Sequence, residues 1–211
     1  MESKTHKKIF FLLALPRSGN TLFGSIMNQN PDIAVTANSI TLEIMKDVFL
    51  LKETDVFQNY PDHKSLNNVL SSVYNTYYKD WNYKYIIDRG PVMTPGNLML
   101  MNANGGIAKE LMAIQNALKP EHKHMCHFLK YDELVNDTEN QINKIYDFLE
   151  IPRFNHNLKS LNQFKVNGIG YDDKVVGNRM HTIREEIRKE SNPYRAMIPE
   201  SIARAYGHIV L

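Results

Sequence analysis

The first apolar run of the chain is followed by a polar turn and then by apolar positions at helical spacing. Residues 9–15 form an unbroken apolar stretch of strand length, which Pro16 ends. Within residues 22–27, apolar side chains then recur three and four positions apart. This order predicts a buried β-strand, a tight loop over residues 16–21 and the N-terminus of a helix.

The alternation of apolar runs and amphipathic segments continues along the chain. Further strands are expected at 33–35, 85–87 and 125–131, and helices at 22–27, 40–51, 66–77, 107–118, 142–149 and 199–206. Strands that alternate with helices are typical of a three-layer α/β domain, P-loop-like, with a mainly parallel central sheet flanked by helices. With 211 residues and no repeat or low-complexity linker, the sequence predicts a single domain over residues 1–211.

Short polar residues indicate where two of the helices begin. Asn38 or Ser39 is expected to cap the helix that follows the second strand, whose apolar face includes Ile40 and Ile44. Thr138 and Gln141 have the spacing of a capping box ahead of the helix at 142–149.

Two polar segments are expected to be loops. Residues 54–65 are interpreted as a surface loop, and residues 88–90 as the loop that leaves the strand at 85–87. In open α/β sheets, ligands bind at the C-terminal ends of the strands, where 16–21 and 88–90 are both expected. Asp88 is either a catalytic or substrate-contacting residue there, or only the cap of a turn.

Composition narrows the class of protein. Hydrophobic residues make up 43% of the chain and charged residues 23%, which is typical of a globular protein. A net charge of +2 argues against a dedicated nucleic-acid-binding protein, which would carry a basic stripe. Cys126 is the only cysteine, so no intrachain disulfide can form, and this fits a reducing compartment.

The N-terminus has some features of a targeting segment. Lys7 and Lys8 precede the apolar residues 9–15, as in a signal peptide, but residues 16–18 do not form a small-residue cleavage site. No stretch approaches the ~18–20 apolar residues of a membrane span. We therefore expect a soluble, cytoplasmic protein.

The loop at 16–21 has the properties of an anion site. The first N–H groups of a helix and the positive end of its dipole attract a phosphate or sulfate, and Arg17 adds a fixed positive charge. The loop is not a nucleoside-triphosphate P-loop, because Ala14 replaces its first glycine and Asn20 replaces its lysine. A kinase or ATPase is therefore not predicted.

The loop resembles that of the sulfotransferases that use 3′-phosphoadenosine 5′-phosphosulfate. Pro16-Arg17-Ser18-Gly19-Asn20-Thr21 is similar, position by position, to their 5′-phosphosulfate loop, which also follows the first strand. Later stretches resemble the bacterial and phage-type branch of the family, in the same order: 85–88, 105–108, 129–134, 145–149 and 180–184.

The resemblance implies roles for individual residues. Arg17 would contact the bridging and sulfuryl oxygens, and the backbone N–H groups of Ser18, Gly19, Asn20 and Thr21, with the Thr21 hydroxyl, would hold the 5′-phosphate. The reaction it implies needs no metal. Its acceptor is a hydroxyl or amine on a small molecule, carbohydrate, lipid or peptide.

Two residue groups outside the loop have side chains of the types used in catalysis or metal binding. Glu43 is placed where some members of the family have their general base, although the solvated face of a helix explains this residue equally well. His122, His124 and Cys126 do not have convincing metal-ligand spacing, and no metal site is predicted.

The sequence departs from the family in its middle. The motif that holds the 3′-phosphate, a strand followed by Arg and later by Ser, is not visible between residues 98–101 and 102–106. The chain is naturally shortened there, or the basic residues Lys174, Arg179, His181 and Arg184 replace these contacts, or use of the donor is lost.

The alternatives to a sulfotransferase are a shortened, non-catalytic homologue that binds a nucleotide or anion, and a phosphate-transfer enzyme with a divergent P-loop. The sequence does not predict the oligomeric state.

Overall fold

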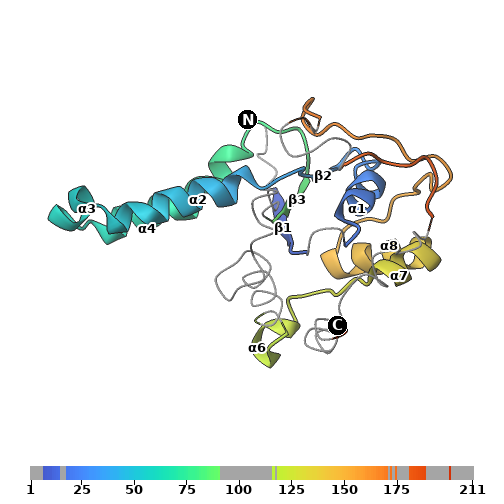
Figure 1. The fold of residues 1–211 in the computed structure, drawn as a ribbon, viewed down its shortest axis with the longest axis horizontal. Helices are drawn as coiled ribbons and strands as arrows, with labels where there is room; N and C mark the ends of the chain where they lie inside the picture. The colour runs from blue at the N-terminus through green and yellow to red at the C-terminus, as the bar shows by residue number, and fades with distance from the viewer. Residues whose placement is uncertain are drawn as a thin grey trace.

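A parallel β-sheet lies at the centre of the computed structural model (Figure 1). The structure describes residues 7–14, 18–90, 118–170 and 181–188, together with the single positions 116, 172, 174 and 200. Within these ranges the sheet has three strands, β1 (Lys8–Leu12), β2 (Ile33–Val35) and β3 (Tyr85–Arg89), in the order β1-β3-β2. The strands expected at 33–35 and 85–87 are confirmed, and the first strand is present but ends at Leu12, earlier than the expected 9–15; all pairs are parallel.

Helices surround this sheet and connect its strands. In chain order they are α1 (Asn20–Met27), α2 (Ile40–Leu50), the short 3₁₀ helix η1 (Leu51–Glu53), α3 (Asp55–Asn59), α4 (His63–Tyr77), α6 (Pro120–Lys123), α7 (Tyr131–Asn136) and α8 (Thr138–Leu149). Parallel strands need crossover connections, which are commonly helical, and the chain uses α1 between β1 and β2 and the α2–α4 segment between β2 and β3. The predicted α/β class is confirmed.

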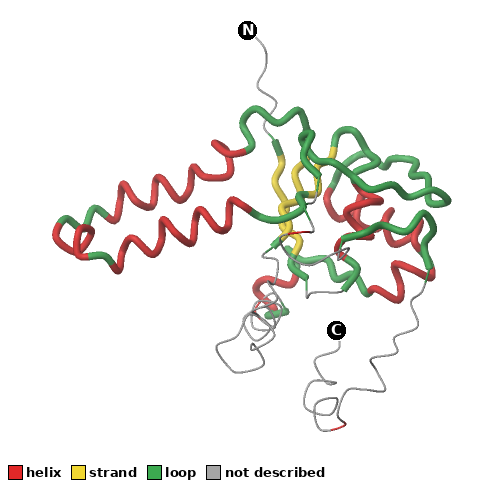
Figure 2. Tube along the Cα trace, turned by 45° about the horizontal axis from the view of Figure 1, so that its top comes forward, coloured by secondary structure: helices red, strands yellow, loops and turns green. Residues whose placement is uncertain are grey.

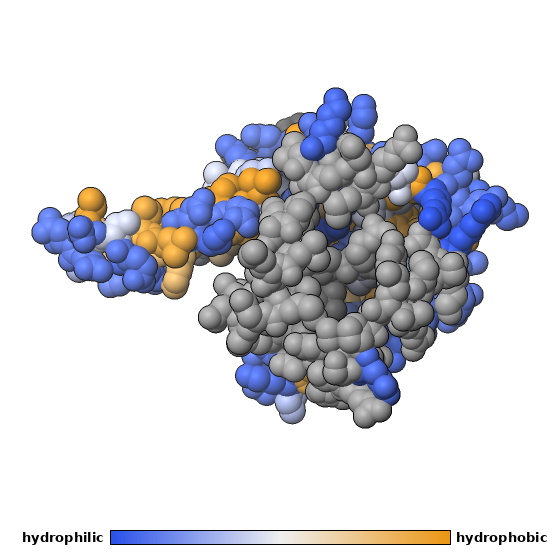
Figure 3. Space-filling model, in the orientation of Figure 1, coloured by the Kyte–Doolittle hydropathy of each residue, from blue (hydrophilic) through white to orange (hydrophobic). Residues whose placement is uncertain are grey.

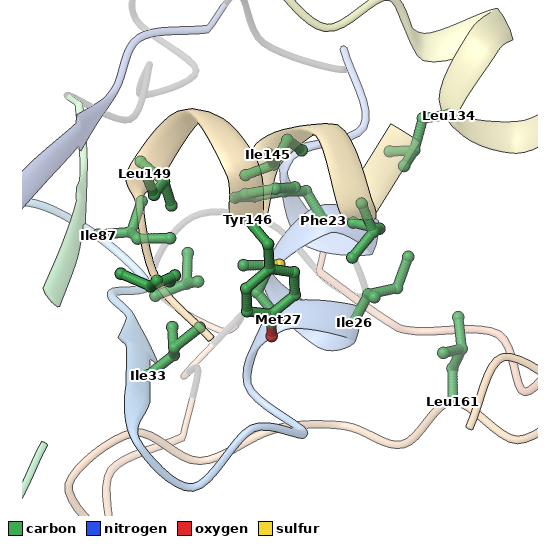
Figure 4. Packing of buried hydrophobic residues seen from close by; sticks show 13 residues of the cluster. Phe23, Ile26, Met27, Ile33, Ile87, Leu134, Ile145, Tyr146, Leu149 and Leu161 are labelled. Carbon is green, nitrogen blue, oxygen red and sulfur yellow. The ribbon is translucent and has the colours of Figure 1, made fainter. Parts of the chain in front are cut away.

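The main core lies where α1 and α8 pack beside the sheet (Figure 4). Ile26 and Met27 of α1 are fully buried, and Tyr146 of α8 lies against them. Burying each side chain of this size stabilises the fold by about 1.5–3 kcal/mol. The Tyr146 hydroxyl accepts a hydrogen bond from Asn30 Nδ2 at 3.0 Å, so its polar end is satisfied inside the core.

The segment from α2 to α4 forms a helical arm that projects from the sheet (Figures 1 and 2). We call residues 40–77 the arm. Helices α2 and α4 pack against each other along it, and η1 and α3 turn the chain at its far end. Ser39 caps α2 by accepting a hydrogen bond from the Leu42 N–H at 3.1 Å, which selects it over the alternative cap, Asn38.

The expected surface loop at 54–65 is largely helical, so this prediction is wrong. Thr54 caps α3 by accepting from the Phe57 N–H at 3.3 Å, and Asp62 caps α4 by accepting from the Ser65 N–H at 3.0 Å. The polar residues that were interpreted as loop residues therefore include two helix caps.

The strand expected at 125–131 is also absent. Its first residues are bound in turns, because the N–H groups of Met125 and Cys126 donate to the carbonyls of His122 and Lys123. At its other end Tyr131 begins α7. Asp132 and Glu133 lie in the first turn of this helix, where their negative charges are stabilised by the positive end of the helix dipole. The apolar Leu129 packs against the core without joining a strand.

Two local details also differ from the predictions. Thr138 does not form the expected capping box with Gln141. Its hydroxyl instead donates to the Leu134 carbonyl at 2.6 Å, because the chain passes directly from α7 into α8. Strand β1 lies at the edge of the described sheet and is not fully buried, since Phe11 is 53% exposed.

Candidate functional site

The C-terminal ends of β1 and β3 lie side by side. Leu12 is in register with Arg89, and the Gly90 N–H donates to the Leu12 carbonyl at 2.9 Å. The two segments that leave these strands therefore start from the same edge of the sheet, the edge where parallel α/β sheets bind ligands. Residues 15–17 lie outside the described part of the chain, and the description resumes at Ser18.

The N-terminus of α1 is built around Gly19. This residue has φ +93° and ψ +10°, a left-handed conformation that glycine adopts without strain, and its carbonyl accepts the Phe23 N–H at 2.9 Å. A Cβ atom added to Gly19 would lie 2.6 Å from Cδ2 of Tyr131, so the tyrosine ring also requires glycine here. Backbone conformation and close packing both restrict this position to glycine.

The first turn of α1 suits an anion. A helix provides no internal acceptor for the N–H groups of its first turn, here those of Asn20, Thr21 and Leu22, and its dipole is positive at this end. The first turn contains no acidic residue that would repel an anion. The Ser18 hydroxyl is exposed and donates to Oδ1 of Asn20 at 3.3 Å. Of the residues predicted for this site, Ser18, Gly19, Asn20 and Thr21 are thus together, while Arg17 falls outside the described residues.

Asp88 is a strand residue, not the start of a loop, and its side chain is 1% exposed. Oδ1 accepts hydrogen bonds from the Thr36 hydroxyl and the Tyr78 hydroxyl, both at 2.9 Å. Oδ2 accepts from the hydroxyls of Ser39, at 2.6 Å, and Thr41. Four hydroxyl groups thus surround the carboxyl group, which matches its capacity of about four acceptor positions.

This cluster attaches the arm to the sheet. Thr36 follows β2, Ser39 and Thr41 begin α2, and Tyr78 follows α4, so Asp88 joins both ends of the arm to β3. Burial, and then the charge of Asp88, raises the pKa of Tyr78, so this hydroxyl keeps the proton that it donates. The geometry favours a positioning role for Asp88.

Arg89 follows Asp88 at the end of β3. The residue is 8% exposed, and its backbone N–H donates to the Thr36 hydroxyl at 2.9 Å. Arginine is rarely this buried, so the end of β3 places a fixed positive charge at the ligand-binding edge of the sheet.

Glu43 lies on the exposed surface of α2, one turn beyond Ser39. Its Oε2 atom forms an ion pair with Nζ of Lys46 at 2.9 Å, and both side chains are more than half exposed. A surface pair of this kind contributes only ~0–1 kcal/mol to stability. The structure does not test whether Glu43 acts as a base, and this role stays a prediction.

Four residues of this region were not singled out from the sequence: Thr36, Thr41, Tyr78 and Tyr131. The hydroxyl residues at 36, 39 and 41, shortly after an apolar strand, are a signal that a buried acceptor lies nearby. No local signal predicts that Tyr131 packs on Gly19, because 111 residues separate them along the chain.

Within the described ranges, no three His, Cys, Asp or Glu side chains are grouped so that they could hold a metal ion. No helix in the described ranges is both long enough and apolar enough to span a membrane.

Comparison with known families identifies the class of protein. Residues 77–192, more than half of the chain, match the family described as "Sulfotransferase domain". The chain therefore belongs to the sulfotransferase family and is an enzyme of the sulfotransferase type, a class that transfers sulfuryl groups. The match includes β3 with Asp88 and Arg89, α7 and α8, and it begins after residues 16–21. No curated protein and no solved structure matches the chain.

Proposed function

We propose that this protein transfers a sulfuryl group from 3′-phosphoadenosine 5′-phosphosulfate to a hydroxyl or amine acceptor. The observation that carries the proposal is the N-terminus of α1, where Gly19 turns the chain at the ligand-binding edge of a sulfotransferase-family sheet. Sulfotransferases generally use this donor, and a helix N-terminus that follows a strand suits its phosphosulfate group.

The loop residues would hold the 5′ end of the donor. The N–H groups of Ser18, Gly19, Asn20 and Thr21 and the Thr21 hydroxyl supply donors, and Arg17 supplies a positive charge with a fork of N–H groups. In-line sulfuryl transfer leaves negative charge on the departing phosphate oxygen. Donors that are already oriented toward this oxygen lower the barrier without further reorganisation.

Glu43 is our candidate for the general base that takes the proton of the acceptor. Its helix is held at the end of β3, because Ser39, four residues earlier, binds Asp88. The carboxylate would have to exchange its contact with Lys46 for one with the acceptor, which is feasible because an exposed pair is weak. In the competing interpretation Glu43 only belongs to the solvated face of α2.

We propose that basic residues near the C-terminus contact the 3′-phosphate, the candidates being Lys174, Arg179, His181 and Arg184. Residues 181–188 are attached to the body of the protein, since the Ile183 N–H donates to Oε1 of Gln163 at 3.1 Å and the Leu161 N–H donates to the Glu185 carbonyl at 2.8 Å. Arg184 in this segment is exposed. Arg179, the other arginine considered for this role, lies outside the described residues.

A binding experiment tests the donor. The protein is titrated with 3′-phosphoadenosine 5′-phosphate and, separately, with ATP and AMP. We expect tighter binding of the first, and we expect Arg17→Ala to weaken it by roughly 10- to 100-fold, the loss of one or two charge-assisted hydrogen bonds. Arg153→Ala is the matched control and should leave the affinity unchanged. Arg153 is an exposed arginine that follows α8 and pairs with Asp147 of that helix.

The outcomes separate donor use from catalysis. Equal affinity for all three nucleotides, or equal effects of the two arginine substitutions, would overturn the donor assignment. Transfer of radiolabelled sulfate to a panel of hydroxyl and amine acceptors then tests the reaction. Binding of 3′-phosphoadenosine 5′-phosphate without transfer to any acceptor would instead support a shortened, non-catalytic homologue.

A further inference from the structure

The segment that follows α8 runs back along α1 and holds this helix in place. We call residues 151–164 the strap. The Gln29 side chain, just after α1, forms two hydrogen bonds with Asn157, from Nε2 to the carbonyl at 3.0 Å and from the Asn157 N–H to Oε1 at 2.7 Å. Within α1, the Ser25 hydroxyl donates to the Asn162 carbonyl at 3.0 Å. The strap therefore positions the helix whose N-terminus is the candidate anion site.

The strap also binds residues 181–188, which include two of the residues proposed to contact the 3′-phosphate. The Leu161 N–H donates to the Glu185 carbonyl at 2.8 Å, and Oε1 of Gln163 accepts the Ile183 N–H at 3.1 Å. One segment thus joins the two parts of the protein to which we assign opposite ends of the donor. Release of the strap would free these parts to move relative to each other.

His156 anchors the strap inside the protein through a chain of three side chains. Asn30 Nδ2 donates to the Tyr146 hydroxyl at 3.0 Å, and this hydroxyl lies 3.0 Å from Nε2 of His156. The orientation of the Asn30 amide is fixed, because its Oδ1 accepts the Asp32 N–H at 3.0 Å. The Tyr146 oxygen is therefore the acceptor toward Asn30, and its hydrogen is donated to His156. This assigns Nε2 as an acceptor and places the proton of the neutral ring on Nδ1.

The second ring nitrogen of His156 lacks a strong partner. Nδ1 is buried close to the Ile26 carbonyl, but in the part of the chain that the structure describes it makes no hydrogen bond of normal geometry. The Phe154 ring packs edge-on against the imidazole, with the ring centroids 5.1 Å apart. Burial lowers the pKa of His156, and the Ile26 carbonyl opposes this only in part. The site therefore favours the neutral ring.

The charged groups around His156 do not replace the lost solvation. An open cavity of about 580 Å³ lies between α8 and the strap, and His156 lines it together with Glu139, Arg153 and Lys159. Glu139 favours a protonated ring, whereas the two cations oppose it, and Arg153 is already paired with Asp147. Water in this cavity gives protons a route to the ring.

We propose that His156 is a pH-sensitive latch, whose protonation releases the strap from α1 and loosens the donor site. Protonation turns Nε2 from an acceptor into a donor, so the buried Tyr146 hydroxyl loses the acceptor of its hydrogen. Release of the strap exposes the imidazolium to water and ends this conflict. The strap suits water on its outer side, since Asn155, Asn157 and Lys159 are exposed and the surface opposite the arm is mainly hydrophilic (Figure 3). The link to the donor rests on the proposed function.

Acid favours the released strap because this state binds the proton more tightly. In the released strap His156 has the ordinary pKa of about 6.5, and in the closed strap its pKa is lower. The share of released molecules should therefore rise by about 10-fold between pH 7.5 and 5.5. The rise ends where the closed state also becomes protonated.

Native-state hydrogen exchange measures this release without any substitution. The amides of Asn157 and Leu161 report it, because their hydrogen bonds join the strap to the rest of the protein. After correction for the intrinsic exchange rate, their protection should fall by about 10-fold from pH 7.5 to 5.5. Nitrogen-correlated NMR of the wild-type protein should show His156 with its proton on Nδ1 at pH 7.5, and the opposite tautomer would overturn the latch.

Two histidine variants show which ring is responsible. His156→Gln keeps an acceptor for the Tyr146 hydroxyl but cannot take up a proton, so the protection of the strap should not change with pH. His127→Gln is the matched control, because burial also lowers the pKa of His127, which packs on Phe148 and lies outside the strap. This control should keep the wild-type pH dependence. Protection that is independent of pH in the wild-type protein, or that falls equally in His156→Gln, would overturn the latch.

The same exchange experiment with 3′-phosphoadenosine 5′-phosphate tests the link to the donor. Bound nucleotide should raise the protection of both strap amides at least fivefold, because it binds the closed state more tightly. Nucleotide that binds without protecting the strap would overturn this link. A nucleotide that does not bind at all would overturn the proposed function instead, and the pH dependence alone would then decide for or against the latch.

Discussion

Replacement of Asp88 by Asn is the sharpest test of how the arm is attached to the sheet. The substitution keeps the shape of the side chain but exchanges one acceptor oxygen for an NH₂ group, which faces hydroxyls that now donate. Each hydrogen bond to a charged group contributes about 1.5–3 kcal/mol, and the amide retains about half of the acceptor positions. We expect a loss of about 3–5 kcal/mol from the free energy of unfolding, similar to breaking a buried charged network.

Urea denaturation followed by circular dichroism measures this loss. The midpoint should fall at an unchanged m-value, and the melting temperature should fall by roughly 6–20 °C, at ~2–4 °C per kcal/mol for a chain of this size. Asp32→Asn is the matched control, because Asp32 pairs with Lys84 at 2.8 Å on the surface and should contribute at most ~1 kcal/mol. Equal midpoints for the two variants would refute the structural role assigned to Asp88.

Two further predictions concern the candidate site and the core. Gly19→Ala should weaken 3′-phosphoadenosine 5′-phosphate binding, and it should destabilise the protein by more than the ~1–2 kcal/mol that a left-handed backbone costs alanine, because the added Cβ also meets the Tyr131 ring. Gly168→Ala, also at positive φ but with no atom within 4 Å of the added Cβ, should lose only that ~1–2 kcal/mol and leave binding intact. Equal effects on binding would contradict the site. Burial lowers the pKa of His127 and His156, so below about pH 6.5 the unfolded chain takes up protons that the folded chain does not, and stability should fall as the pH falls. Thermal melts between about pH 7.5 and 5 check the sign, and His156→Gln should reduce the slope; a melting temperature that rises on acidification would contradict it.

Local signals predicted the elements near the candidate site well. The apolar run before Pro16 and the spacing of residues 22–27 indicated β1 and α1, and both are present. Residues 33–35 and 85–87 were also correctly predicted as strands. In each case the pattern of apolar side chains within a few residues is sufficient, because burial of one face determines the local conformation.

The failures occurred where a local pattern has two physical solutions. The apolar residues of 125–131 can be buried in a strand or in an irregular segment, and the turn after His122 and the start of α7 at Tyr131 select the second. The polar residues of 54–65 can solvate a loop or cap helices, and Thr54 and Asp62 do the latter.

The sequence by itself determined the α/β class, the strand–loop–helix unit that carries Gly19, and the resemblance to sulfotransferases, since all three depend on neighbouring residues or on short motifs. Only the tertiary structure decided that Tyr131 packs on Gly19, that four hydroxyls converge on Asp88, and that Ile40 and Ile44 of α2 are partly exposed. These features join residues that are distant along the chain. They depend on how strands and helices pack, and no local periodicity encodes that packing.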